Sequence, residues 1–222
     1  MHTILDYELD ILKEKIFKML DMSLESINNS MDALKKFDIN LAQKVIDNDK
    51  KVDKLENIID EECLRILVTK QPAATDARLI LSILKINTDL EKIADLSTSI
   101  AIEVKNLVKV KILNPLINLF KMSEISCNML KDALDSISNK NSVLAKEIIL
   151  KDDILDEINN NFHGEMYSYI SKKPEFLNQA ISLMKISKSL ERIGDHIANI
   201  AERAVYYIDG DNVRHTESEK VI

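Results

Sequence analysis

The stretch ILKINTDLEKIADLSTSIA at residues 83–101 decides the fold, because a related stretch, LMKISKSLERIGDHIANIA, stands at residues 183–201. In both copies apolar residues recur at steps of three and four, which is the spacing of the buried face of an amphipathic helix. Each copy also carries an acidic pair four residues apart. The chain therefore contains a helical unit that occurs twice, at an offset of 100 positions.

A second pair of windows extends the repeat to the preceding helix of each half. VIDNDKKVDKL at residues 45–55 corresponds to IILKDDILDEI at residues 148–158, at an offset of 103. Pro72 and Pro174 then interrupt the two halves at nearly the same place. The duplicated unit thus comprises several helices with short connections between them.

Helical periodicity predicts three helices in each half of the 222-residue chain. Only three Gly and three Pro are present, which leaves few turn residues for a β fold. The first two expected helices cover about 7–37 and 40–68, and Thr75 and Asp76 can cap the third. The fourth restarts around 110–115 and runs to about 137, and the last two cover about 142–170 and 175–207. We therefore predict an all-α protein of two tandem, pseudo-symmetric three-helix bundles, residues 1–108 and 109–210, followed by a polar tail, residues 211–222.

The buried stripe of the third helix is the clearest of the six. It is expected to consist of apolar side chains at alternating steps of three and four, with one serine among them. These residues are Ile83, Ile86, Leu90, Ile93, Ser97, Ile100 and Val104.

Composition excludes several classes of protein. The net charge of -7 and the lack of basic clusters interleaved with aromatics argue against nucleic acid as a partner. Residues 1–10 do not resemble a signal peptide, and no apolar run approaches the length of a membrane span, so a cytoplasmic protein is expected. Cys63 and Cys127 have no partner at ligand spacing and are interpreted as buried, reduced thiols. No catalytic motif for phosphate, acyl or di-iron chemistry is present, so we do not expect an enzyme.

Four acidic pairs recur at equivalent places in the two halves. Their spacing of four residues puts both carboxylates of a pair on one helix face, where they repel each other unless a cation lies between them. Hard carboxylate oxygens suit magnesium, manganese, calcium or iron better than zinc. The candidate metal ligands are Asp49, Asp53, Glu91 and Asp95 in the first half, and Asp152, Asp156, Glu191 and Asp195 in the second.

Two interpretations of these pairs stay open on spacing alone. The 37 acidic residues would give about six such pairs by chance, so a solvated acidic face explains them as well as a metal site does. Small residues, Ala94 and Gly194, precede the second acid of one motif in each half, which suits close helix packing or a crowded ion cluster. His163 is a secondary candidate ligand, and His196 is expected to be a hydrogen-bonded bystander.

At these motifs the sequence resembles the PhoU family of regulators of bacterial phosphate transport. The resemblance lies in DLEKIAD (residues 89–95) and SLERIGDHIANIAE (189–202), in DEECLRIL (60–67) followed by QPAATDARLI (71–80), and in VYYIDGDNVRH (205–215). It extends through nearly the whole chain. The match of the surrounding motif is closest at Glu91, Asp95, Glu191 and Asp195, while only the spacing matches at the other four acids.

The resemblance implies a protein that commonly forms a homodimer and binds iron, manganese, magnesium or zinc ions, which can form multinuclear clusters, on the acidic motifs. It also implies a cytoplasmic negative regulator that contacts the phosphate ABC transporter and a membrane sensor histidine kinase, at the inner face of the membrane. The alternative is a scaffold or metal-binding bundle unrelated to phosphate signalling. Alanine at position 94, in place of the glycine seen at 194, is expected to weaken the packing of ions in the first half.

Overall fold

The computed structural model describes residues 3–107 and 117–211, and within these ranges all regular structure is helical. Six long α-helices and one short 3₁₀ helix follow one another along the chain. Their bounds are α1 Ile4–Lys36, α2 Ile39–Lys70, α3 Ala74–Leu107, α4 Ile117–Ser138, α5 Ser142–Lys172, η1 Pro174–Phe176 and α6 Leu177–Asp209. The predicted all-α fold of two three-helix bundles is confirmed.

Some predicted boundaries differ from the structure. α3 begins at Ala74, so Thr75 and Asp76 lie in its first turn instead of preceding it as caps. Pro174 opens the 3₁₀ helix η1, so α6 begins at Leu177. Proline has no backbone N–H, which makes the first turn of a helix its natural place. The predicted division between 108 and 109, and the tail from residue 212 onward, lie outside the described residues.

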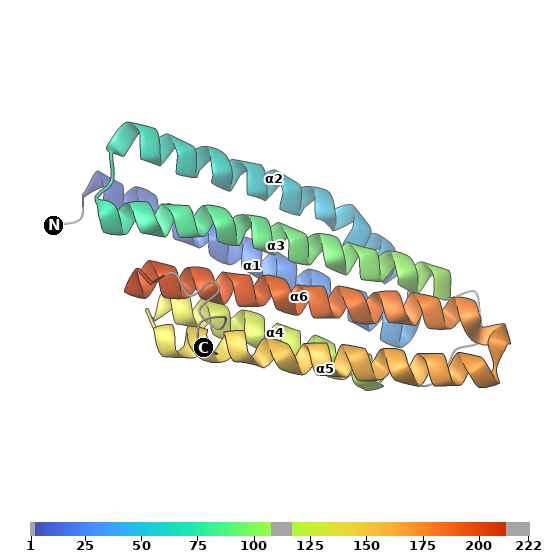
Figure 1. Ribbon diagram of the computed structural model, residues 1–222. Coiled ribbons are helices and arrows are strands. Elements are labelled where there is room, and N and C mark those ends of the chain that lie inside the picture. The colour runs from blue at the N-terminus through green and yellow to red at the C-terminus, as the bar shows by residue number, and fades with distance from the viewer. Residues whose placement is uncertain (1–2, 108–116, 212–222) are drawn as a thin grey trace, which may run out of the picture.

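The helices α3 and α6 form the centre of the molecule (Figure 1). They pack against each other in antiparallel directions, α1 and α2 pack on α3, and α4 and α5 pack on α6. α1 also contacts α4, so the two bundles meet along more than one line. Each central helix therefore buries several sides, and the whole predicted stripe of α3 is buried.

Local signals in the sequence explain where several helices begin and end. Thr3 accepts a hydrogen bond from the backbone of Asp6 and closes a capping box at the start of α1. Asp38 caps α2 through its side chain immediately after Phe37, which takes a left-handed conformation at the end of α1. Gly210 ends α6 at a φ of 81°, a conformation that glycine adopts without strain. These short connections keep neighbouring helices antiparallel.

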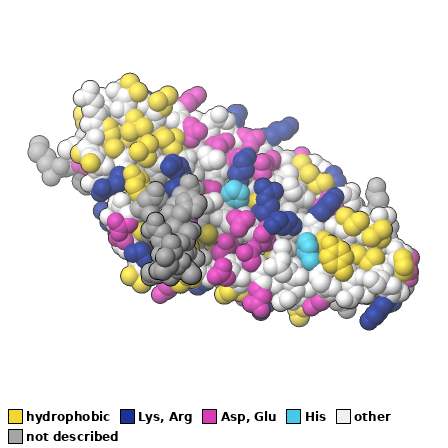
Figure 2. Space-filling view, in the orientation of Figure 1, with side chains coloured by type: hydrophobic (Ala, Val, Ile, Leu, Met, Phe, Trp, Pro, Cys, Tyr) yellow, Lys and Arg dark blue, Asp and Glu magenta, His cyan; other side chains and the backbone are white. Residues whose placement is uncertain are grey.

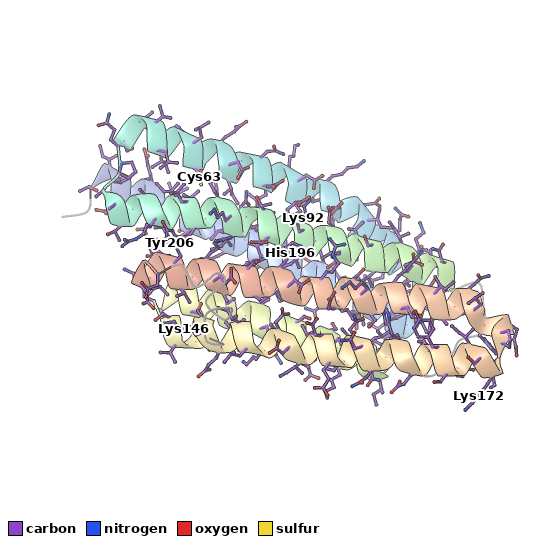
Figure 3. The ribbon with its side chains drawn as sticks, in the orientation of Figure 1. Cys63, Lys92, Lys146, Lys172, His196 and Tyr206 are labelled. Carbon is purple, nitrogen blue, oxygen red and sulfur yellow. The ribbon has the colours of Figure 1, made fainter. Side chains whose placement is uncertain are left out.

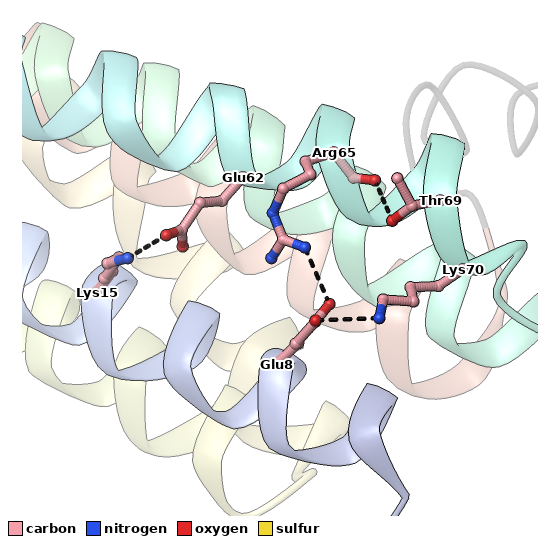
Figure 4. Close-up of polar contacts among 6 residues, drawn as sticks. All are labelled: Glu8, Lys15, Glu62, Arg65, Thr69 and Lys70. Carbon is pink, nitrogen blue, oxygen red and sulfur yellow. Dashed lines mark hydrogen bonds and ion pairs between the residues drawn. The ribbon is translucent and has the colours of Figure 1, made fainter.

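Ion pairs join α1 to α2 on the surface (Figure 4). Glu8 accepts from Arg65 at 3.3 Å and from Lys70 at 3.2 Å, and Lys15 pairs with Glu62. Each surface ion pair of this kind contributes little to the free energy of unfolding. We therefore infer that their main role is to align α1 with α2.

Both cysteines are buried and free, as the sequence predicted. Burial raises the pKa of the Cys63 thiol to about 12 and also raises that of Cys127. Both thiols are therefore neutral at physiological pH, and a neutral thiol is a poor nucleophile and metal ligand.

Gly194 marks the place where α5 and α6 approach most tightly among the glycines described. A Cβ at this position would lie 2.4 Å from Leu155 Cδ1 and 2.6 Å from Asp152 Oδ1. At the equivalent places the first half has Ala94 and Val52, both buried. The extra methyl of alanine is thus matched by a smaller side chain on the facing helix.

Gly194→Ala is expected to destabilise the protein by about 1–2 kcal/mol, because the new methyl overlaps buried atoms of α5. Adding Leu155→Val, which copies the first half, should recover much of that loss. Gly164→Ala is the matched control, because a Cβ at residue 164 meets nothing within 4 Å. It should be neutral or slightly stabilising through helix propensity. Urea unfolding of the four proteins measures the difference, and equal stability of the two alanine variants would contradict this packing.

Candidate metal centre

The second half brings three of its four predicted ligands together. Ligand atoms of Asp156 on α5 and of Glu191 and Asp195 on α6 all lie within 4.8 Å of one another. Asp156 and Asp195 are exposed, while Glu191 is buried. The cluster is therefore open to solvent on one side and rests on the packed α5–α6 interface on the other.

Two buried carboxylate oxygens beside this cluster have no hydrogen-bond donor. They are Oδ1 of Asp152, which lies on α5 one turn before Asp156, and Oε2 of Glu191. Buried polar atoms are rarely left without a partner, so a proton or a cation is needed at this place. The donors are all carboxylate oxygens, which fits a hard divalent or trivalent cation. The residues present thus fit the metal site that the sequence predicts.

The electrostatics agree with this geometry. Burial, together with the negative charges of Asp195 and Asp156, raises the pKa of Asp152 to about 7. Burial also raises the pKa of Glu191, as does the charge of Asp195, although a hydrogen bond from Lys188 at 2.5 Å acts in the opposite direction. Without a cation these acids destabilise one another's charged forms. A bound metal ion would reverse the sign of that effect.

The first half places its four predicted ligands near one another, but with a different internal arrangement. Burial raises the pKa of Asp49, as do the charges of Asp95 and Asp53. The Lys92 ammonium lies 2.8 Å from Glu91 and 3.5 Å from Asp95. Within the described ranges, the acids of this half do not form a compact set of three ligand atoms like that of the second half.

Lysine side chains therefore compete with any cation in both halves, which the spacing of the acids did not predict. Lys92 bridges the two acids of its own motif, and hydrogen bonding to Glu91 raises its pKa. In the second half Lys188 pairs only with Glu191, and Arg192, at the position of Lys92, forms no ion pair within the described ranges. The sequence does contain a signal for these pairs: Lys92 is one residue from Glu91 and three from Asp95, and Lys188 is three residues from Glu191. The second half is thus the more accessible of the two sites.

Three further residues clarify the site. Glu56 on α2 was not predicted, yet burial and the charge of Glu91 raise its pKa, so it belongs to the acidic group of the first half. His163 is outside the compact cluster, and its Nε2 is buried without a partner. His196 Nδ1 lies 2.9 Å from Asp89 across the α3–α6 interface, which agrees with the expected structural role (Figure 3).

The charged groups occupy the middle of the face on which α2, α3, α6 and α5 are seen (Figure 2). Acidic and basic side chains gather there, and hydrophobic side chains gather toward both ends of the same face.

Comparison with known proteins agrees with the repeat, the fold and the motifs. The family model described as "PhoU domain" matches residues 16–104 and again residues 119–204. The chain belongs to the PhoU family. The two matches correspond to the two halves, so the PhoU repeat is the three-helix unit with its pair of acidic helices.

The chain is similar in sequence and in structure to several PhoU proteins. The phosphate-specific transport system accessory protein PhoU homolog of Aquifex aeolicus is 36% identical over 94% of each chain. The crystal structure of PhoU from Pseudomonas aeruginosa superposes with a TM-score of 0.90 at 31% identity, covering 93% of this chain and 99% of that one. A PhoU structure from Streptococcus pneumoniae gives 0.88 at 28% identity, covering 94% of this chain and 99% of that one.

Asp152→Asn tests the electrostatics of the PhoU acidic cluster. A carboxyl whose pKa rises from 3.8 to about 7 on folding favours the folded state while it is protonated, and this benefit is lost as the pH rises through 7. The substitution should therefore raise the free energy of unfolding of the metal-free protein by on the order of 1 kcal/mol at pH 8. At pH 3.5 the gain should be absent.

Asp153→Asn is the control, because it removes the same charge from an exposed neighbouring position on α5. It should change stability much less. Chemical unfolding at the two pH values gives the comparison, and equal gains for both variants would show that Asp152 is not the constrained carboxyl.

Proposed function

We propose that this PhoU-family chain is a cytoplasmic regulator of phosphate uptake and of the phosphate-starvation response. It would act through contacts with the phosphate ABC transporter and with a membrane sensor histidine kinase, keeping the starvation response off when phosphate is plentiful. The observation that carries the proposal is the match of both halves to the PhoU model, together with relatives named as accessory proteins of phosphate-specific transport.

The structure supports action by contact. A rigid pair of bundles that binds one state of a partner more tightly than another shifts that partner's equilibrium by its differential affinity, and no catalytic step is required. Among the described helices, none is long and apolar enough to cross a membrane. The proposed contacts are with the cytoplasmic parts of the transporter and the kinase.

The acidic motifs give this regulator a metal-dependent surface. Asp156, Glu191 and Asp195 would hold one cation, with Asp152 beside them, and the first half would hold a second more weakly because Lys92 competes for Glu91 and Asp95. A bound cation neutralises charge that would otherwise repel an acidic partner or the facing helix. Metal occupancy and docking would then be coupled.

Metal binding is expected to depend most on the second half. Glu191→Ala/Asp195→Ala should lower the affinity for Mn²⁺ or Fe²⁺ by about tenfold or more, because it removes two of the three clustered ligands. Glu91→Ala/Asp95→Ala is the matched variant of the first half and should have a smaller effect. Metal content by elemental analysis and titration calorimetry provide the measurements, with helicity checked for each protein.

Loss of the gene should leave phosphate-starvation genes expressed at high phosphate, and the wild-type gene should restore repression. Restoration by Glu191→Ala/Asp195→Ala as complete as that by the wild type, despite lost metal, would separate metal binding from regulation. Unchanged metal content in that variant would instead reduce the motifs to a charged surface. A chain that restores nothing and binds neither transporter nor kinase would favour a scaffold outside phosphate signalling.

A further inference from the structure

The turn that follows the first helix of each half has the same backbone structure in both halves. Phe37 precedes Asp38, the cap of α2, and Lys140 precedes Asn141, the cap of α5. Phe37 and Lys140 take left-handed conformations with φ values of 52° and 51°, and the backbone N–H of each donates to the carbonyl three residues earlier. Their side chains therefore leave the backbone at equivalent places, but one is aromatic and the other is charged.

These two side chains fill space differently. Phe37 is partly buried and packs against the hydrophobic core, whereas Lys140 is exposed. A second difference lies near the ends of the central helices, where the offset of 100 relates Val104 on α3 to the smaller Ala204 on α6, and both are buried. The two replacements remove an aromatic ring and two carbon atoms from the end of the molecule that contains Lys140 and Ala204.

A cavity of about 160 Å³ lies where these two replacements meet, and both Lys140 and Ala204 line it. It is bordered by residues of α1, α3, the end of α4 and the end of α6, on the side of the molecule where α3 begins (left in Figure 1). Most of its lining is apolar and includes Ile83 and Ile86. An apolar cavity of about 150 Å³ can hold one benzene molecule. The cavity therefore has room for a single ring.

Ser82 supplies an independent sign that a polar group is needed in the cavity. It lines the cavity and is 2% exposed, and its Oγ has no hydrogen-bond partner within the described ranges. The equivalent Ser182 donates to Glu103 at 2.8 Å, and Glu103 also accepts from Lys185. Arg203 takes the position of Glu103 at the other end, and a guanidinium cannot accept a hydrogen bond. Because a buried hydroxyl without a partner is unusual, an acceptor from a bound molecule fits here.

Lys140 gives the cavity a positive charge at its exposed rim. Its ammonium lies 5.9 Å from the centre of the Tyr207 ring, and it forms no ion pair with the residues that the structure describes. Lys13, the other lysine of the lining, is paired with Asp10 at 2.9 Å. A negatively charged group at the rim would therefore be attracted by Lys140, whose long side chain can turn toward it.

We propose that this cavity binds a small aromatic acid, which is a single ring that carries a carboxylate. The ring takes the place that the Phe37 ring has in the first half. The acid group supplies the acceptor that Ser82 lacks and the negative charge that pairs with Lys140. The inference rests neither on the proposed regulatory role nor on a metal ion.

Titration of the purified chain with phenylacetate tests the site, at constant ionic strength. Calorimetry should show saturable binding, and the ring of phenylacetate should shift the methyl NMR signals of Ile83 and Ile86, which line the cavity. Phenylacetamide keeps the ring but lacks the charge, so it should bind about fivefold more weakly or worse. Acetate, which lacks the ring, should not bind. Absence of saturable phenylacetate binding, or equal affinity for phenylacetate and phenylacetamide, would overturn the proposal.

Two variants close the cavity by copying the other half. Ala204→Val copies Val104, and Lys140→Phe copies Phe37. Each should lower the affinity for phenylacetate by about tenfold or more and raise the melting temperature of the ligand-free protein, because it fills a cavity. Helicity is checked for both, so that one folded variant suffices for the test. Unchanged phenylacetate affinity in a folded variant of either kind would reject the cavity as the binding site.

Lys140→Gln tests the charge at the rim separately from the shape of the cavity. It should weaken phenylacetate binding by about fivefold and leave phenylacetamide binding unchanged, because only the charged ligand pairs with the ammonium. Lys173→Gln is the matched control, since the Lys173 ammonium also lies over a tyrosine ring, 5.2 Å from the centre of Tyr169, but does not line the cavity. It should change neither affinity. An equal loss of phenylacetate affinity in the two lysine variants would contradict the pairing of Lys140 with the acid.

Discussion

The antiparallel packing of α3 against α6 is the constraint on which the rest of the structure depends. Each of these helices must bury an apolar stripe, and each also serves as the third helix of its own bundle. A bundle of three amphipathic helices has little core on its own, so joining two bundles through α3 and α6 increases the buried fraction of the surface. The polar side chains of α3 and α6 include the charged groups of functional interest.

This packing also allows the two halves of the repeat to differ at separate places. Residues that the duplication makes equivalent sit at opposite ends of the α3–α6 interface, because the helices run in opposite directions. A substitution in one half therefore changes one end only. Glu103 satisfies two donors at one end, while Arg203 adds charge at the other. Duplication produced the two three-helix bundles, and single substitutions then gave the two ends of the α3–α6 interface different charges.

Much of the fold could be predicted from the sequence because it depends on periodicity and repetition, which are local properties. The stripe from Ile83 to Val104, the two repeated windows and the break at Pro174 were sufficient for six helices in two bundles. Helix starts were less accurate, since Thr75 is an acceptable cap but Ala74 is already helical. The candidate site was predicted as residue types on a helix face. Which acids come close depends on side-chain contacts between helices, and these have no local signature.

Lys92 shows why the sequence could not rank the two halves. Its position beside Glu91 in the sequence is matched by Arg192 beside Glu191, so the two motifs look equally available. In the structure the Lys92 ammonium reaches both Glu91 and Asp95, and the longer Arg192 side chain of the second half makes no such pair within the described ranges.

In the first half the Lys92 ammonium therefore stabilises the charged forms of Glu91 and Asp95 without a metal ion. The second group keeps two buried carboxylate oxygens without donors, so the physical need for a cation is greater there. Two motifs of one origin thus differ in how far the side chains of the chain itself neutralise their acids.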